Sequence, residues 1–351
     1  MNEQKLSADA RQAGPGAAGP PGGEHKDTAR RVGIPSGTAG RNLGLIVALV
    51  ALAVVGCVTA GSRFASLDNL MVILSLASVI GVVSIGMTFV ITGGGIDLSV
   101  GSVLGLASVW ATTLATQTMA DQYGWVVMAV CALAVGLGAG LVNGVLVAYG
   151  RVVAFIATLA TMVAARGLAE LIANRRTQIV DVDSFTDTFR GDLLGVPKIV
   201  WIFVAVAVAG WFLLNRTTFG RRTVAVGGNP EAARLAGIKV RRHTMYLYAL
   251  AGLAAGIAGV MMLARTTAGS STNGTLYELD AIAAVVVGGT LLAGGRGTIV
   301  GTVLGVLIFA TLTNLFIQNN LDSSVQAVAK GAIIIVAVLL QQRLTARSTT
   351  G

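Results

Sequence analysis

Long runs of apolar residues alternate with short polar segments along this chain of 351 residues. About 20 consecutive apolar residues in a helix are enough to cross the hydrocarbon core of a bilayer. The pattern therefore predicts an all-α membrane protein, a polytopic bundle of about ten transmembrane helices. The predicted spans are 43–60, 69–91, 100–118, 125–148, 152–173, 198–214, 244–264, 279–293, 298–316 and 323–341.

The two ends of the chain lack such runs. Residues 1–42 are polar and rich in Gly, Ala and Pro, and a segment of this composition cannot bury a hydrophobic core. We expect a disordered tail there, followed by one transmembrane domain over 43–342 and a short tail at 343–351. The longest basic loop within the domain is 215–243.

Composition and charge agree with a membrane protein and orient it. Only 12% of the residues are charged and 54% are hydrophobic, whereas about 25% are charged in soluble domains. The net charge is +9, and loop 215–243 holds seven Lys or Arg residues against one acid. Basic residues in short loops mark the cytoplasmic side. We therefore expect this loop and both termini in the cytoplasm, and we assign the basic balance to topology instead of nucleic-acid binding.

Glycines spaced four apart recur in the apolar runs and predict close helix packing, because packing drives helix association in lipid. An internal repeat also relates 94–105 (GGIDLSVGSVLG) to 294–305 (GGRGTIVGTVLG). Internal repeats and glycine-broken helices are typical of transporters, in which the breaks often border the substrate region. The glycine pairs are Gly101 and Gly105, Gly136 and Gly140, Gly140 and Gly144, Gly252 and Gly256, and Gly301 and Gly305.

Segment 88–102 (TFVITGGGIDLSVGS) breaks a predicted span with three glycines and places Asp97 among apolar residues. An acid near the bilayer centre costs roughly 2.5–3.5 kcal/mol, so it needs a role or a partner. One interpretation is a translocation path through this segment and the mouth of a later span. In the other, Asp97 or Ser99 caps exposed N–H groups, and the later acids are ordinary interfacial residues. The candidate path residues are Thr88, Gly94, Gly95, Asp97, Ser99, Ser102, Glu278 and Asp280.

The basic loop contains a predicted short helix. Asn229 suits its N-cap, Pro230 its first turn and Gly237 its end. Glu231 complements the helix dipole at the N-terminus. Such a capped helix between two spans is typical of a docking element, and a solvated connector is the alternative.

Four other side chains carry expectations. Arg166 and Glu170, four apart in one predicted span, can pair on one helix face. Lys330 can extend to the membrane interface. Cys57 and Cys131 lie in apolar runs, so we expect small core residues instead of a disulfide.

The chain lacks the patterns of several other functions. It has no P-loop, no HExxH pattern and no Cys/His cluster for zinc. We therefore predict no catalytic residue, metal or cofactor in this chain and no enzyme activity of its own. The main alternative to a transport protein that docks a partner through the basic loop is an ion-coupled secondary transporter of a small polar solute. It could use Asp97 and Glu170, but it would leave the capped basic loop unexplained.

Four blocks in this order resemble the sugar-type permeases of bacterial ABC importers, the branch for ribose, xylose, arabinose and galactosides. The resemblance covers roughly 43–342 and implies a monosaccharide importer of the inner membrane, with ribose the expected cargo. The blocks are GMTFVITGGGIDLSVGS (86–102), RVVAFIATLATMVAARGL (151–168), GGNPEAARLAGIKV (227–240) and YELDAIAAVVVGGTLLAGGRGTIVGTVLG (277–305).

The resemblance also implies partners. These are a second permease subunit, in the simplest case another copy of this chain, a cytoplasmic ABC ATPase that binds ATP and Mg²⁺, and an extracytoplasmic sugar-binding protein. The third block is similar to the coupling motif of that family. It implies an ATPase-contacting element made of Gly228, Asn229, Glu231, Ala232, Ala233 and Gly237.

Overall fold

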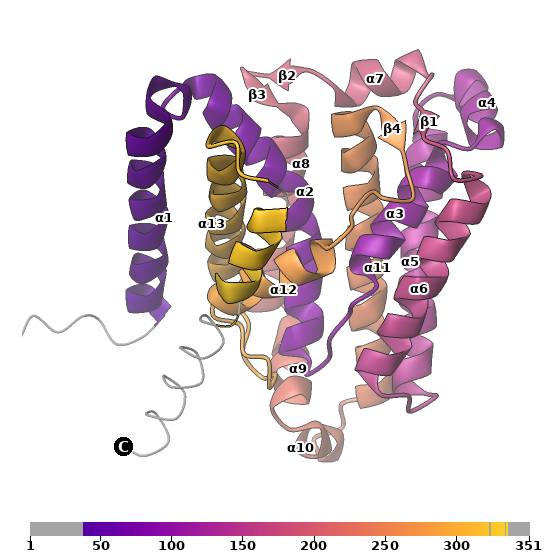
Figure 1. Cartoon of the computed structure of the whole chain (residues 1–351). Helices are drawn as coiled ribbons and strands as arrows, with labels where there is room; N and C mark the ends of the chain where they lie inside the picture. Colours follow the sequence, from indigo (N-terminus) through magenta and orange to yellow (C-terminus); the bar gives the residue numbers. More distant parts are fainter. Residues whose placement is uncertain (1–37, 323, 334, 336–351) are drawn as a thin grey trace, which may run out of the picture.

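The computed structural model describes residues 38–322, 324–333 and 335. Within this part of the chain, seven helices are long and apolar enough to cross a membrane. They are α1 (Thr38–Ala60), α2 (Leu67–Thr92), α5 (Val126–Ala148), α6 (Ala154–Ile172), α8 (Lys198–Arg216), α11 (Val240–Thr266) and α13 (Ile299–Gln318) (Figure 1). The structure confirms the all-α polytopic class and seven of the predicted spans.

The other three predicted spans differ in length. The span at 100–118 is a short helix, α3 (Val100–Ala111), followed by α4 (Leu114–Tyr123), because Thr112 ends the first helix and Thr113 caps the next. The span at 279–293 is α12 (Tyr277–Val287), which stops where Gly289 adopts a positive φ. Of the span at 323–341, residues 324–333 and 335 are helical and the remainder lies outside the described residues.

The terminal segments are only partly described. Helix α1 begins at Thr38, so the boundary at residue 42 of the predicted tail is wrong. Residues 1–37 and the C-terminal tail at 343–351 lie outside the described residues. The predicted disorder of the first segment therefore stays a prediction.

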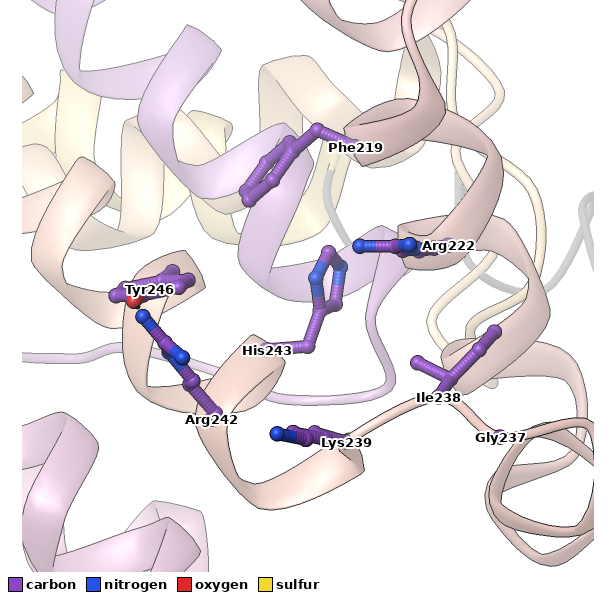
Figure 2. Close-up of a pocket in the computed structure, with 8 residues that line it drawn as sticks. All are labelled: Phe219, Arg222, Gly237, Ile238, Lys239, Arg242, His243 and Tyr246. Carbon is purple, nitrogen blue, oxygen red and sulfur yellow. Dashed lines mark hydrogen bonds between the residues drawn. The ribbon is translucent and has the colours of Figure 1, made fainter.

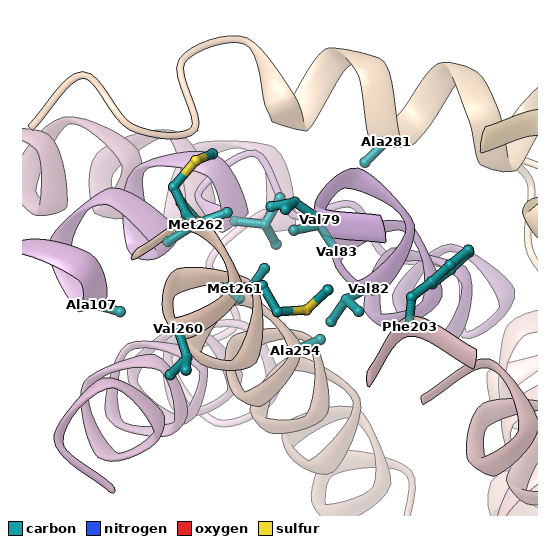
Figure 3. Close-up of a cluster of buried hydrophobic side chains, with 14 of the residues drawn as sticks. Val79, Val82, Val83, Ala107, Phe203, Ala254, Val260, Met261, Met262 and Ala281 are labelled. Carbon is teal, nitrogen blue, oxygen red and sulfur yellow. The ribbon is translucent and has the colours of Figure 1, made fainter. Parts of the chain in front are cut away.

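Two long helices, α2 and α11, run antiparallel through the middle of the bundle and form most of its core. Figure 3 shows Val79, Val82 and Val83 of α2 packed toward Met261 and Met262 of α11. All five side chains are buried, and α2 and residues 247–264 of α11 are apolar around their whole circumference. A helix of that kind belongs inside a bundle.

Each central helix continues into a broken-helix limb. After α2 the chain runs through 93–99 to α3, and after α11 it runs through 270–276 to α12. Both short helices begin part-way along the long ones, and the two limbs enter from opposite ends of the bundle (Figure 1). Antiparallel units of this kind are typical of transporters. The two segments of the predicted sequence repeat, 94–105 and 294–305, do not correspond to these two limbs. Both segments begin at the same end of the bundle, and they lead into α3 and α13.

The glycine pairs do allow close approach. Helices α5 and α11 meet through Gly136, Gly140 and Gly144 on one side and Gly252 and Gly256 on the other. A Cβ at any of these positions would collide with backbone of the facing helix. The structure therefore confirms these contacts as helix packing.

The remaining pairs have different partners. The spacing of Gly101 and Gly105 predicted contact with another helix. Instead they face the extended limb at Gly274 and Asn273. Gly301 packs on Gly288, and Gly305 packs on α12.

The ends of the bundle are built differently. One end carries α7 (Asp183–Phe189) and short antiparallel pairs, β1 (Gln178–Ile179) with β4 (Ala268–Gly269) and β2 (Asp192–Leu193) with β3 (Val196–Pro197). A 3-10 turn, η1 (Gly61–Arg63), joins α1 to α2. The other end carries the basic loop as α9 (Thr218–Gly228) and α10 (Pro230–Leu235) (Figure 1). We call this the α10 end.

The cysteines are both free. Cys131 is half-buried in α5, but Cys57 is exposed on α1. The expectation of a core residue is therefore wrong for Cys57, because one face of α1 is uncovered in the single chain.

Candidate translocation and coupling sites

The break after α2 is a built turn. The N–H groups of Gly93, Gly94 and Gly95 donate to the carbonyls of Phe89, Ile91 and Val90 at 2.9–3.0 Å. These bonds satisfy carbonyls that the end of a helix otherwise leaves free. Gly94 has a φ of +83°, which glycine adopts without strain. The chain can therefore reverse at the α10 end and climb back beside α11.

Asp97 lies in the returning limb and is fully buried. Its Oδ1 accepts hydrogen bonds from the backbone N–H of Ser99 at 2.9 Å and from the Ser99 hydroxyl at 2.6 Å. Asn143 of α5 donates to the Ser99 hydroxyl at 2.8 Å, and Thr161 of α6 donates to the Asn143 side chain at 2.5 Å. We call these four residues the Asp97 chain. It ties the start of α3 to two other helices.

Thr88 is separate from the Asp97 chain. Its hydroxyl bonds to the Ser84 carbonyl and to the hydroxyl of Thr302, each at 2.8 Å. All three residues are buried. Thr88 therefore joins α2 to α13.

A cavity of about 430 Å³ lies beside the start of α12. We call it the Glu278 cavity. Ser102 of α3, Arg166 and Glu170 of α6, and Thr275 and Glu278 contribute its polar side chains. It is the place where the two limbs and α6 come together.

Glu278 is 8% exposed, and its Oε2 has no hydrogen-bond partner among the described residues. Oε2 lies against Gly101, where a Cβ would collide with it. Arg166 is held nearby, since its guanidinium donates to the carbonyls of Ser271 and, at 3.0 Å, Asn273. The cavity thus combines a fixed cation with a carboxylate whose inner oxygen, packed against Gly101, has no hydrogen-bond partner among the described residues.

Two expected roles of ionisable residues are wrong. Glu170 Oε2 lies 3.8 Å from Arg175 Nε, and Arg166 donates to the extended limb. Arg166 and Glu170 therefore do not form an ion pair with each other. Lys330 does not extend to the interface, because its Nζ lies 2.9 Å from Asp280 Oδ2. Asp280 is therefore neutralised by a partner, unlike Glu278 two residues earlier.

The capped helix in the basic loop is confirmed as α10. The Asn229 side chain accepts from the N–H of Ala232 at 2.9 Å, and Pro230 occupies the first turn. Arg234 donates two hydrogen bonds to Glu231, and they hold the pKa of Glu231 below its ordinary value. Gly237 ends this segment with a φ of +83°.

The predicted ATPase-contacting residues are unequally placed. Gly228, Asn229, Glu231, Ala232 and Gly237 are exposed, but Ala233 is 4% exposed and faces the protein. Leu235, which none of the sequence motifs singled out, is a large apolar side chain that is 75% exposed on α10.

The end of α9 contacts the break of α2. Gly295, in the turn before α13, donates its N–H to the Thr92 carbonyl at 2.8 Å. A Cβ at Gly227 would collide with the same carbonyl, and Gly294 packs against Gly94. We call this meeting point the glycine junction. It connects the basic loop directly to the limb that carries Asp97.

The long apolar helices, the two limbs and the exposed capped helix define a polytopic membrane protein of the transporter class. Among the described residues, no group of three His, Cys, Asp or Glu side chains could hold a metal ion. The comparisons with known proteins specify the class further.

A family model described as "Branched-chain amino acid transport system / permease component" matches residues 69–339. The ribose import permease protein RbsC of Escherichia coli is 42% identical over 303 residues, 85% of this chain and 92% of that protein. RbsC of Bacillus subtilis is 42% identical over 280 residues, 79% of this chain and 86% of that protein.

The L-arabinose transport system permease protein AraH of Escherichia coli is 37% identical over 307 residues, 85% of this chain and 90% of that protein. No solved structure matches the chain. The chain therefore belongs to the permease family of bacterial ABC importers, in the branch that contains the ribose and L-arabinose permeases. It is a multi-pass protein of the inner membrane.

Proposed function

We propose that this chain is the membrane-spanning subunit of a binding-protein-dependent importer that carries a monosaccharide, with ribose the first candidate. Two copies assemble with a cytoplasmic ABC ATPase and an extracytoplasmic sugar-binding protein. The α10 end and both termini lie in the cytoplasm. The identity to two ribose permeases over most of their length supports the cargo.

The observation that carries the mechanism is the contact between α9 and the break of α2. An ATPase that grips α10 would move α9 with it, and Gly227 lies against the Thr92 carbonyl. A displacement of the loop would therefore reach the 93–99 limb through backbone contact. Switching between packings by rigid movement of helices is a known repertoire of transport proteins.

The residues proposed for contact with the ATPase are those exposed on and beside α10. They are Gly228, Asn229, Glu231, Ala232 and Gly237, and Leu235 joins them as an apolar anchor. Buried apolar anchors carry much of the binding energy of protein interfaces. Ala233 supports α10 from within.

We assign the sugar path to the Glu278 cavity. The Ser102 hydroxyl would donate to or accept from sugar hydroxyls, and the Glu278 carboxylate would accept from them, because a polyol is rich in both donors and acceptors. Thr88, Gly94, Gly95, Asp97, Ser99 and Asp280 would support that path without lining this cavity.

The test is ribose uptake by proteoliposomes that contain this chain with its ATPase and binding protein. Gly227→Ala places a Cβ on the Thr92 carbonyl, whereas a Cβ at Gly138 of α5 would meet no atom within 4 Å. We expect Gly227→Ala to lose uptake while the ATPase still co-purifies, and the control Gly138→Ala to retain uptake.

Depletion of ATP distinguishes the classes of transporter. Uptake by the wild-type protein should stop without ATP. Uptake that persists without ATP and ceases when an ion gradient is dissipated would show a secondary transporter instead.

A further inference from the structure

A second cavity, of about 410 Å³, lies beside the basic loop, between α9 and the start of α11. Figure 2 shows Arg222 and Arg242 on either side of His243, with Lys239 below them in this view. Phe219 lies above His243 in the same view. We call this space the basic cavity. The sugar path does not use it, and the proposed ATPase contact shares only Gly237 with its lining.

The positive charges of the basic cavity are uncompensated. No acid lines it, and Arg222, Lys239 and Arg242 make no ion pair within the part of the chain that the structure describes. Glu231, the acid of the same loop, is bound to Arg234. Like charges around one cavity repel each other, so an anion that enters relieves the repulsion and gains attraction to all three.

The walls hold Arg242 and His243 in place. Arg242 donates to the Tyr246 hydroxyl at 2.6 Å, and its guanidinium carbon lies 5.4 Å from the ring centroid. The ring of His243 is 2.9 Å from the Thr223 hydroxyl and packs on Phe219 with centroids 4.7 Å apart. The cavity is therefore a shaped site with an aromatic wall and a buried floor.

Its level in the membrane indicates the ligand. The α8 span ends at Arg216 and the α11 span begins at Val240, so the cavity lies where two spans meet the aqueous edge. Arg216 stacks over Trp211 at 5.4 Å, and aromatic and basic side chains gather at the headgroup level of membranes. Basic pockets between helices at that level suit anionic headgroups.

We propose that the basic cavity binds the phosphate of an anionic phospholipid of the cytoplasmic leaflet. The leaflet follows from the orientation given under the proposed function, whereas the phosphate site itself does not depend on the cargo. The bound headgroup bridges Arg222 of α9 to Lys239 and Arg242 at the start of α11. It thereby steadies the basic loop relative to the bundle.

The experiment is native mass spectrometry of the purified full chain in detergent, titrated with phosphatidylglycerol. The target variant is Arg222→Gln with Arg242→Gln. Arg221→Gln with Arg241→Gln is the matched control, because each position is one residue away, exposed and outside the basic cavity. Two fewer charges should weaken binding of the lipid by about 30-fold in the target variant. The control should bind as the wild type does.

Equal loss in both variants would overturn the proposal, because binding would then follow net charge alone. A titration with inorganic phosphate separates the two sources of the same chemistry. Displacement of the lipid by millimolar phosphate would identify free phosphate as the ligand and overturn the lipid.

The rival occupant is an acidic side chain of the ATPase. Wild-type lipid binding by the target variant, combined with loss of ATPase co-purification, would assign the basic cavity to that subunit and overturn the proposal. Neither measurement requires sugar transport. Failure of the ribose assignment is therefore distinguishable from failure of the lipid site.

Discussion

The two broken-helix limbs each bury an acid near the start of a short helix, but the two acids differ in their hydrogen bonds. Asp97 accepts two hydrogen bonds from Ser99 and is linked through Asn143 to α5. Glu278 has a carboxylate oxygen without a partner and lines a cavity.

Burial alone therefore does not identify a transport residue. Most buried polar groups in proteins have a partner, and one that lacks a partner needs an explanation. A ligand that arrives only during transport would be such an explanation for Glu278. Asp97 needs none, since its hydrogen bonds already stabilise the limb.

The largest expected effect is on stability and concerns Asp97. Asp97→Ala leaves the Ser99 N–H and hydroxyl without their acceptor in a buried place, which should cost about 3 kcal/mol. Asp97→Asn keeps an oxygen acceptor and should lose less. Thermal unfolding of the detergent-purified variants measures both. An Asp97→Ala protein of wild-type stability without uptake would place Asp97 in the path.

A smaller effect is expected where α3 faces Glu278. Gly101→Ala directs a methyl group at the Glu278 carboxylate and the Gly274 carbonyl, and such overpacking typically costs about 1–3 kcal/mol. Gly167→Ala is the control, because Gly167 lines the same cavity but has open space around its Cβ position. We expect only Gly101→Ala to lower the unfolding temperature. Equal behaviour of the two variants would contradict the close contact.

Glu278→Gln should change transport without changing stability. The amide keeps the size of the side chain but removes the charge that strengthens hydrogen bonds to sugar hydroxyls. We expect the initial rate of uptake at low ribose to fall about tenfold, equivalent to about 1.4 kcal/mol. Unfolding temperature is the control measurement. A variant that unfolds earlier and transports normally would reverse the comparison and make Glu278 the structural acid.

Part of this arrangement could be predicted from the sequence, because it depends on local patterns. Runs of apolar residues predicted seven spans, and the glycines at 93–95 predicted the break after α2. Asn229 and Gly237 predicted the two ends of α10. Each of these signals is contained within a few neighbouring residues. The spacing of the glycines also predicted close helix packing, but only the structure shows that α5 and α11 face each other.

The pairing of ionisable groups could not be predicted in the same way. Asp280 and Lys330 are 50 residues apart and meet only after folding. The same spacing rule that predicted Arg166 with Glu170 ignored the limb that binds Arg166. The unfilled oxygen of Glu278 likewise depends on what surrounds it in three dimensions.

The members of the Asp97 chain on α5 and α6 left a weak signal in the sequence. Asn143 is a lone amide within the apolar run of α5, and such a residue inside a span usually bonds to a neighbouring helix. Thr161 gives no such sign, because a threonine can bond to its own helix. Only the structure shows that it donates to Asn143.

The smallest expected effect tests that last link. Thr161→Val removes the hydroxyl that donates to Asn143 but keeps the shape of the side chain. Hydrogen bonds between membrane helices average about 0.6 kcal/mol, so a shift in unfolding temperature of a few degrees at most is expected. Thr158→Val is the control, since Thr158 bonds only within its own helix.

The two threonine variants decide how far the Asp97 chain extends. If Thr161→Val is more damaging than Thr158→Val, the stabilising network reaches α6. If both variants behave alike, the network ends at Asn143, and the outer wall of the Glu278 cavity is free to move independently of Asp97. The boundary between the part of the bundle that the Asp97 chain fixes and the part around the Glu278 cavity would then lie between α5 and α6.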